Sequence, residues 1–255
     1  MQVVQIAFSP TGGTQRAADI VTEALGFPGE KIDLTDPHAS FSTIRLDEED
    51  VAVIAVPSFG GRVPALAAER LARVSGHGAR AILVCVYGNR AYEDTLVELE
   101  DVARAAGFHE VAALAAVAEH SILHQYATGR PDGTDRAELE DFARRIAEKL
   151  AGPDAATAPT GVPGNRPYKN AGSSTMVPKG DSSCVACGLC ARRCPAQAID
   201  PANPRKTDAE RCIGCMRCVS ECPQGARKLN GALLKAAGLA LRKACSERKG
   251  CEFYL

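Results

Sequence analysis

The chain has 255 residues, of which 45% are hydrophobic and 24% charged, a composition typical of a soluble globular protein with one or two domains. The formal net charge of −1 argues against a nucleic-acid-binding protein, and without a run of about 18 uncharged apolar residues no membrane span is expected. The first residues, MQVVQIAFSP, lack the basic segment of a signal peptide. We therefore expect a reducing, cytoplasmic location, in which clustered cysteines bind metal rather than form disulfides.

Residues 1–150 alternate between strand and helix patterns. The apolar runs of strand length are residues 3–8, 30–35, 51–56, 79–87 and 110–119. Helical patterns occupy residues 14–25, 63–74, 91–106 and 135–150. Continuous apolar strands alternating with helices predict a parallel sheet covered on both faces, although no obvious helix links the second and third strands. The predicted fold class is α/β, a doubly wound parallel sheet of order 2-1-3-4-5 whose ligand crevice lies beyond strands one and three.

The loop after the first strand, SPTGGT at residues 9–14, precedes a predicted helix. Hydroxyls and exposed backbone N–H groups at a helix N-terminus favour phosphate binding. The residues that supply them are Ser9, Thr11, Gly12, Gly13 and Thr14. A helix cap with a tight turn explains the same residues without a ligand. The loop has neither the lysine of a P-loop nor the spacing of GxGxxG.

After the first strand of this fold, the loop resembles the flavodoxin phosphate loop, Ser/Thr-x-Thr-Gly-x-Thr, with Gly13 where flavodoxins often have Asn. The resemblance covers residues 1–150 and implies bound FMN, with the flavin ring between the loops PSFGGRVP (57–64) and YGNRAYED (87–94). It implies that Phe59 and Tyr92 stack on the ring, with Tyr87 as the reserve. The other residues expected to contact FMN are Ser58, Gly60, Gly61, Gly88, Asn89 and Arg90.

Residues 151–180 connect this part to the rest of the chain. They hold five prolines and five glycines, which predicts a linker, while Tyr168 and Met176 indicate that part of it packs. Beyond it, residues 184–255 carry 13 Lys+Arg against 6 Asp+Glu, a formal +7 that leaves −8 on residues 1–183. These charges favour docking of the two parts, although two separately solvated surfaces account for them equally well.

A cysteine motif occurs twice in the second part. CVACGLCARRCP at 184–195 returns 28 positions later as CIGCMRCVSECP at 212–223, so eight of the eleven cysteines lie within 39 residues. A zinc ribbon needs two cysteine pairs per metal. Three closely spaced cysteines with a fourth before proline do not match that pattern well. The spacing C-x2-C-x2-C-x3-C-P is that of bacterial-type ferredoxins with two 4Fe-4S clusters, which residues 181–230 resemble.

The ferredoxin resemblance implies that the fourth cysteine of each copy binds the other copy's cluster. The implied ligands of cluster I are Cys184, Cys187, Cys190 and Cys222, and those of cluster II are Cys212, Cys215, Cys218 and Cys194. Residues 231–255 are expected to form a terminal helix and a basic tail. We interpret Cys85, Cys245 and Cys251 as structural or incidental. His120 and His124 have the i, i+4 spacing of a metal pair but lack an evident third ligand.

The whole chain resembles the flavodoxin–ferredoxin fusion proteins of anaerobic bacteria and archaea, which implies electron transfer between FMN and the clusters. Our main hypothesis is an electron carrier between redox protein partners that the sequence does not identify. No second Rossmann unit or nicotinamide fingerprint is visible, which favours the carrier. One alternative is a flavin-dependent oxidoreductase, acting on a quinone or NAD(P)H, with the clusters as an internal wire. Another is a flavodoxin-like domain that only docks. The sequence identifies neither catalytic residues nor an oligomeric state.

Overall fold

The computed structural model describes residues 2–26, 29–172 and 176–255. The strands are β1 (Val3–Ala7), β2 (Glu30–Asp33), β3 (Val51–Pro57), β4 (Arg80–Tyr87), β5 (His109–Val117), β6 (Lys179–Gly180), β7 (Arg227–Lys228) and β8 (Glu252–Tyr254). The helices are α1 (Gly13–Ala24), α2 (Ala65–Leu71), α3 (Thr95–Ala105), α4 (Gly133–Ala151), α5 (Leu189–Arg192), α6 (Arg217–Ser220) and α7 (Gly231–Cys245), with a short 3-10 helix, η1, at Phe41–Thr43.

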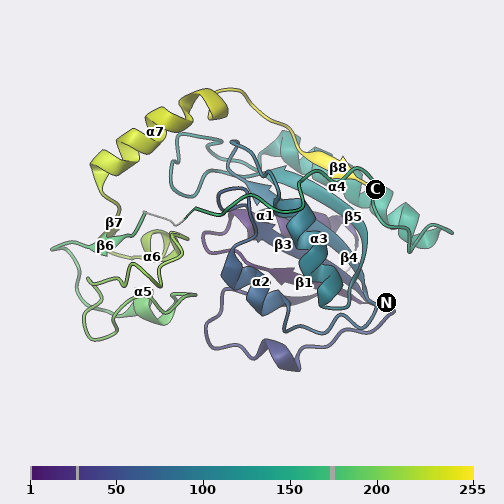
Figure 1. The fold of residues 1–255 in the computed structure, drawn as a ribbon, viewed down its shortest axis with the longest axis horizontal. Coiled ribbons are helices and arrows are strands. Elements are labelled where there is room, and N and C mark those ends of the chain that lie inside the picture. The colour runs from purple at the N-terminus through teal and green to yellow at the C-terminus, as the bar shows by residue number, and fades with distance from the viewer. Residues whose placement is uncertain (1, 27–28, 173–175) are drawn as a thin grey trace.

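The main sheet has the strand order β2-β1-β3-β4-β5-β8 (Figure 1). Its first five strands are parallel and in the predicted order, so the flavodoxin-like fold class is confirmed. β3 and β4 are buried along almost their whole length, as continuous apolar runs require when helices cover both faces. The sixth strand, β8, was not predicted. It comes from the basic tail and pairs antiparallel with β5.

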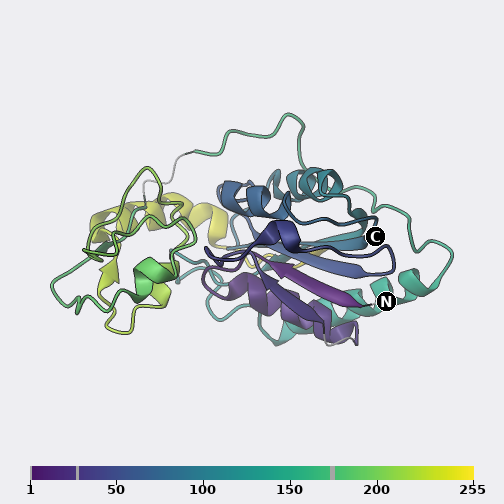
Figure 2. The ribbon, with the colours of Figure 1, turned by 90° about the horizontal axis from the view of Figure 1, so that it is seen from below.

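Two layers of helices enclose the sheet (Figure 2). On one face, α1 and α4 bury Val21 and Phe142 against it. On the other face, α2 and α3 bury Leu71 and Leu99. The four helical patterns of the first part therefore place their apolar stripes where the amphipathic spacing predicts. These four helices cover the faces of the sheet and leave the carboxyl ends of the parallel strands available for a ligand.

The second part is a small unit at one end of the molecule, built from α5, α6 and the two-stranded β6–β7 sheet (Figure 1). Its two cysteine copies share one backbone conformation. Gly188 and Met216, 28 positions apart, are both left-handed N-caps, with φ of 73° and 63°. Ala186 and Gly214 are a second left-handed pair. The repeated motif therefore specifies a repeated loop, whichever residue occupies the left-handed position.

Buried arginines join the two parts. Arg217 of α6 donates to Thr35 Oγ1 at 2.6 Å and lies 3.9 Å from a carboxylate oxygen of Asp33. In the other direction, Arg70 of α2 donates to the carbonyl oxygen of Pro195 at 2.7 Å. Each part therefore contributes one arginine to the contact, and only Arg217 of the second part lies near a carboxylate of the first.

The linker is anchored to α3 over part of its length. Asp94, at the N-cap of α3, accepts from the backbone N–H groups of Asn165 at 2.9 Å and Lys169 at 2.6 Å. Arg166 pairs with Asp101 at 2.8 Å. Within the described part of the chain, no helix is long and apolar enough to cross a membrane.

Candidate functional site

A cavity of about 590 Å³ lies beyond the carboxyl ends of β1, β3, β4 and β5. This is the place where doubly wound sheets bind ligands, and the volume is in the range of small-molecule and cofactor sites. Of the residues predicted to contact FMN, the cavity is lined by Thr11, Gly13, Thr14, Ser58, Phe59, Gly60, Tyr87, Gly88 and Arg90. Those outside its lining are Ser9, Gly12, Gly61, Asn89 and Tyr92.

The predicted phosphate loop leads into α1, whose N-cap residue has no side chain. Gly12, the N-cap, has a left-handed φ of 87°, and the first turn carries no acidic residue. The Ser9 hydroxyl accepts from the backbone N–H of Gln15 at 2.8 Å, so this predicted FMN contact satisfies one N–H group of the first turn of α1 instead. A Cβ on Gly13 would lie 3.2 Å from the Cβ of Ala118. The close approach of Ala118, which directly follows β5, thus explains the glycine at position 13, where flavodoxins often have Asn. The dipole of α1 favours a bound anion at the N-terminus of this helix.

The three aromatic residues predicted to stack on the flavin differ in their position relative to the cavity. Phe59 and Tyr87 line the cavity. Tyr92, expected to stack on the flavin, lies outside it: only 7% exposed, it donates to Glu252 Oε2 at 2.7 Å and its hydroxyl is 2.9 Å from that of Tyr254. Because β8 supplies these partners, Tyr92 holds the C-terminal strand rather than a ligand.

The loop after β5 supplies cavity residues that the sequence pattern did not single out for this role. His120 Nδ1 accepts from the backbone N–H groups of Ile122 and Leu123, each at 3.2 Å. The neutral ring must therefore carry its proton on Nε2, and burial lowers the pKa of His120. His124 Nδ1 lies 2.7 Å from Glu119, so the two histidines do not converge on a common metal position.

The eight cysteines of the repeated motif form two groups, each around a small cavity of about 20 Å³. One cavity is lined by Cys184, Cys187, Cys190 and Cys222. The other is lined by Cys194, Cys212, Cys215 and Cys218. These two groups are the ones that the ferredoxin resemblance implies. In each, the fourth cysteine of one copy lies beside the first three cysteines of the other copy.

The sulfur spacing fits a cluster better than a single ion. Four thiolates on one zinc, each about 2.3 Å from the metal, lie about 3.8 Å from one another. Among the described residues, the only three metal-ligating groups within 4.8 Å of one another are Asp135, Glu138 and Cys251, and none of the eight motif cysteines belongs to such a group. Larger spacing among cysteines is what a polynuclear cluster with one thiolate per iron requires.

Backbone donors reach the fourth cysteine of each copy in the same way. The N–H of Ala198 donates to Cys194 Sγ and that of Ala226 to Cys222 Sγ, both at 3.3 Å. Burial opposes ionisation of Cys222, but the N–H groups around it outweigh burial and lower its pKa. Burial raises the pKa of the Cys215 thiol to about 12, so its proton must be displaced by a metal.

The second cysteine copy forms part of the wall of the large cavity. Cys212, Ile213, Gly214 and Cys215 line it together with the phosphate loop, and α7 contributes Ala237 and Leu241. The site predicted for cluster II therefore borders the cavity directly. None of the residues of the first cysteine copy lines it.

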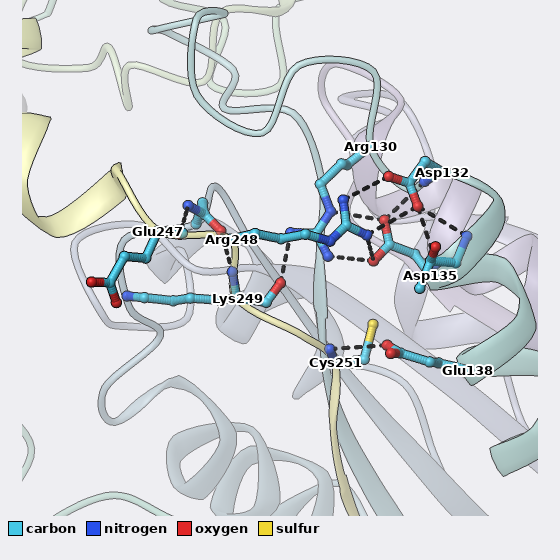
Figure 3. A network of polar contacts seen from close by, with 10 residues as sticks. Arg130, Asp132, Asp135, Glu138, Glu247, Arg248, Lys249 and Cys251 are labelled. Carbon is cyan, nitrogen blue, oxygen red and sulfur yellow. Dashed lines mark hydrogen bonds and ion pairs between the residues drawn. The ribbon is translucent and has the colours of Figure 1, made fainter.

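Side chains of the first domain hold α7 against the cavity. Tyr126 donates to the carbonyl oxygen of Gly238 at 2.6 Å, and Asn89 Nδ2 donates to that of Cys245 at 3.0 Å. Further along, Arg248 reaches Asp132 at 2.7 Å and Asp135, which also pairs with the buried Arg130 (Figure 3). Arginines engage Asp132 and Asp135, and Glu138 accepts from the backbone N–H of Cys251, so this network fastens the tail.

Comparison with known protein families identifies a segment in the second part of the chain. Residues 182–227 match the 4Fe-4S dicluster domain family. An uncharacterized protein of Methanothermobacter thermautotrophicus is 36% identical over 66 residues, and the match spans 25% of this chain and 14% of that protein.

Solved structures of flavodoxin-like proteins cover a little more than half of this chain. A flavodoxin of Streptococcus pneumoniae TIGR4 is 22% identical over 58% of this chain and 97% of its own, with a TM-score of 0.40. Rubredoxin oxygen:oxidoreductase of Desulfovibrio gigas is 14% identical over 59% of this chain and 36% of its own, with a TM-score of 0.42. With TM-scores this low, the fold assignment depends on the sheet order rather than on these likenesses.

Proposed function

We propose that this chain, which joins a flavodoxin-like domain to a 4Fe-4S dicluster domain, transfers electrons between FMN in the large cavity and two clusters held by the eight motif cysteines. The observation that carries the proposal is the shared wall: Cys212 and Cys215 line the same cavity as Thr11 and Thr14 of the phosphate loop. When bound, FMN exchanges electrons singly or in pairs, which allows it to serve one-electron clusters.

The chain's own residues divide the work of binding. Thr11, Thr14 and the free N–H groups at the start of α1 would hold the phosphate. Phe59 and Tyr87 would give the flavin ring an apolar wall. His120, with its proton on Nε2, would offer a neutral hydrogen-bond donor.

The position of the second cysteine copy favours a carrier over an oxidoreductase with its own substrate. A quinone or nicotinamide would have to approach the flavin through the cavity. Ile213 and the adjoining cysteine loop close one side of it, and Leu241 of α7 lies on its wall as well. Electrons can pass from the loop to the cavity without a second ligand entering.

Anaerobic purification followed by flavin, iron and sulfide analysis tests the cofactors, with about eight irons and eight sulfides expected per chain. Stopped-flow reduction then tests the route. A one-electron donor should reduce the flavin at a rate independent of protein concentration, and Cys212→Ala should slow this step far more than the matched change Cys245→Ala, which lies outside the cysteine motif. Equal rates in Cys212→Ala and the unaltered protein would refute the route. Rapid reduction by NADH or NADPH alone would instead support the oxidoreductase.

A further inference from the structure

The repeated cysteine loop is covered in one copy and exposed in the other. The shift of 28 residues that relates the two copies also relates Val185 to Ile213, and each of these residues directly follows the first cysteine of its copy. Ile213 is partly buried, packs against the core of the first domain and lines the large cavity. Val185, in contrast, is 64% exposed. The second copy therefore uses this apolar position for a contact between domains, whereas in the first copy the position faces solvent.

The exposed loop borders the site predicted for cluster I. Val185 and Cys187 line the small cavity of the cluster I cysteines, and both are exposed, as is Pro223 on the same cavity. Among the described residues, no acidic side chain lines this cavity. A single exposed valine is common on protein surfaces. Here, however, the other copy covers the equivalent residue, so the repeat marks Val185 as a position suited to a contact.

Two arginines flank this loop, and neither is paired with an opposite charge in the described part of the chain. Arg192 donates to the carbonyl oxygen of Cys187 and Arg205 to that of Cys184, both at 3.1 Å. Both arginine side chains are exposed. Asp181, which lies just before the loop, is engaged by Lys228 at 2.6 Å. The loop therefore presents an apolar tip with a positive charge on either side.

We propose that Val185, Ala186 and Cys187, flanked by Arg192 and Arg205, form the docking surface of an acidic protein that carries a one-electron redox centre. An apolar side chain of the partner would cover Val185, as the first domain covers Ile213, and carboxylates at the edge of the contact would meet the two arginines. A bound cluster is negative, but it lies inside the ring of cysteines, so a carboxylate at the surface meets the exposed guanidinium groups first.

The charges also disfavour a second copy of this chain as the occupant. A symmetric contact through this loop would bring the same two arginines from each copy to one interface, where like charges repel. The inference rests on the proposed function, because one electron must pass between the reduced partner and a cluster bound beside the loop, and the partner is oxidised in the same step.

The first test measures binding without electron transfer. A purified acidic ferredoxin, oxidised and labelled with a dye, is titrated with the anaerobically prepared whole chain, and its fluorescence anisotropy gives Kd. At low salt, Arg192→Gln combined with Arg205→Gln should raise Kd about tenfold or more, and added salt should reduce this difference. Val185→Asp should weaken binding as well, whereas lysine at both arginine positions keeps the charge and should have a smaller effect. The matched controls, Arg242→Gln and Leu239→Asp, alter exposed residues of α7 and should change Kd less than about twofold.

Stopped-flow mixing separates this inference from the proposed function. Reduced methyl viologen, a small cationic donor that needs no docking surface, should reduce the flavin no more slowly in the double Gln variant than in the unaltered protein. Reduced ferredoxin should react more slowly with that variant. If Arg205→Gln lowers the iron content, Arg192→Gln and Val185→Asp decide.

The results that overturn the inference are equally specific. If viologen reduces the flavin but the variants of the loop bind ferredoxin as the α7 controls do, the docking surface is wrong and the proposed function stands. A dimer of the unaltered chain in sedimentation, dissociated by Val185→Asp, would assign the surface to a second copy instead. If neither donor reduces the flavin, or the unaltered protein binds no clusters, the proposed function fails as well.

Discussion

Replacing Thr35 by valine should loosen the contact between the two domains by a predictable amount. The Thr35 side chain is fully buried, and its hydroxyl accepts a 2.6 Å hydrogen bond from Arg217, which is 5% exposed. A hydrogen bond to a charged group contributes about 1.5 to 3 kcal/mol. Valine has a similar shape but leaves the guanidinium without this acceptor. Asp33 adds little, because its side chain is half exposed and 3.9 Å away.

The effect is measurable once the linker is cut, since docking then becomes an equilibrium between two fragments. With a protease site placed after Thr157 in the exposed stretch of the linker, Thr35→Val should raise the dissociation constant of the fragments about 10- to 150-fold. Fluorescence anisotropy of a dye on the C-terminal fragment measures it. Iron content should stay unchanged, because Thr35 lines neither of the two small cysteine cavities.

The same substitution at an exposed threonine supplies the control. The exposed Thr43 hydroxyl donates to the carbonyl oxygen of the adjacent N-cap residue Ser40, so Thr43→Val should change the dissociation constant less than twofold. Arg217→Met combined with Thr35→Val should cost less than the sum of the single changes, because both remove one interaction. A Thr35→Val effect no larger than that of Thr43→Val would show that this hydrogen bond does not contribute to docking.

Three further predictions concern the cofactor sites and the linker. Cys222→Ala should remove the EPR signal of cluster I and Cys194→Ala that of cluster II, whereas loss of the nearer cluster in each case would refute cross-ligation. Thr11→Ala and Thr14→Ala should each weaken FMN about 10- to 150-fold but riboflavin little, as measured by flavin fluorescence titration; equal weakening would exclude a phosphate contact. The N–H groups of the linker lower the pKa of Asp94, so this carboxylate stabilises the anchored linker above its ordinary pKa of about 3.9. That contribution is lost as the pH falls through the lowered pKa, which hydrogen exchange of the linker should detect in the unaltered protein but not in Asp94→Asn.

The parts that sequence predicted well are those with local or repeated patterns. Apolar runs and amphipathic spacing located five strands and their helices, since burial on both faces imposes them directly. The 28-residue repeat, together with the ferredoxin resemblance, grouped Cys194 and Cys222 with the opposite copies. The same shift also aligns Val185 with Ile213, but the sequence alone does not show that one is exposed and the other covered.

The parts that sequence missed depend on contacts between distant segments. β8 has only three residues, and its pairing with β5 requires the chain to return from the second domain, which no local pattern encodes. That return also decides the role of Tyr92. Two aromatic residues near one loop cannot be ranked as flavin neighbours until the partner of each is known, and the partners of Tyr92 lie in β8.

The C-terminal segment returns from the dicluster domain to the first domain, which ties the two domains together. The dicluster domain is held at its beginning by linker residues bound to Asp94 and at its end by α7 and β8. A unit tied at both ends, and docked through Arg217, need not diffuse to find the flavin cavity. Under the proposed function, exchange with external partners would then fall to the side away from that cavity. There Cys187 is exposed, and Val185 is one of three large hydrophobic residues exposed on the described surface. If flavin and clusters bind as proposed, a buried connection to the flavin and an open one to solvent would give the two clusters different tasks, as a directed electron relay requires.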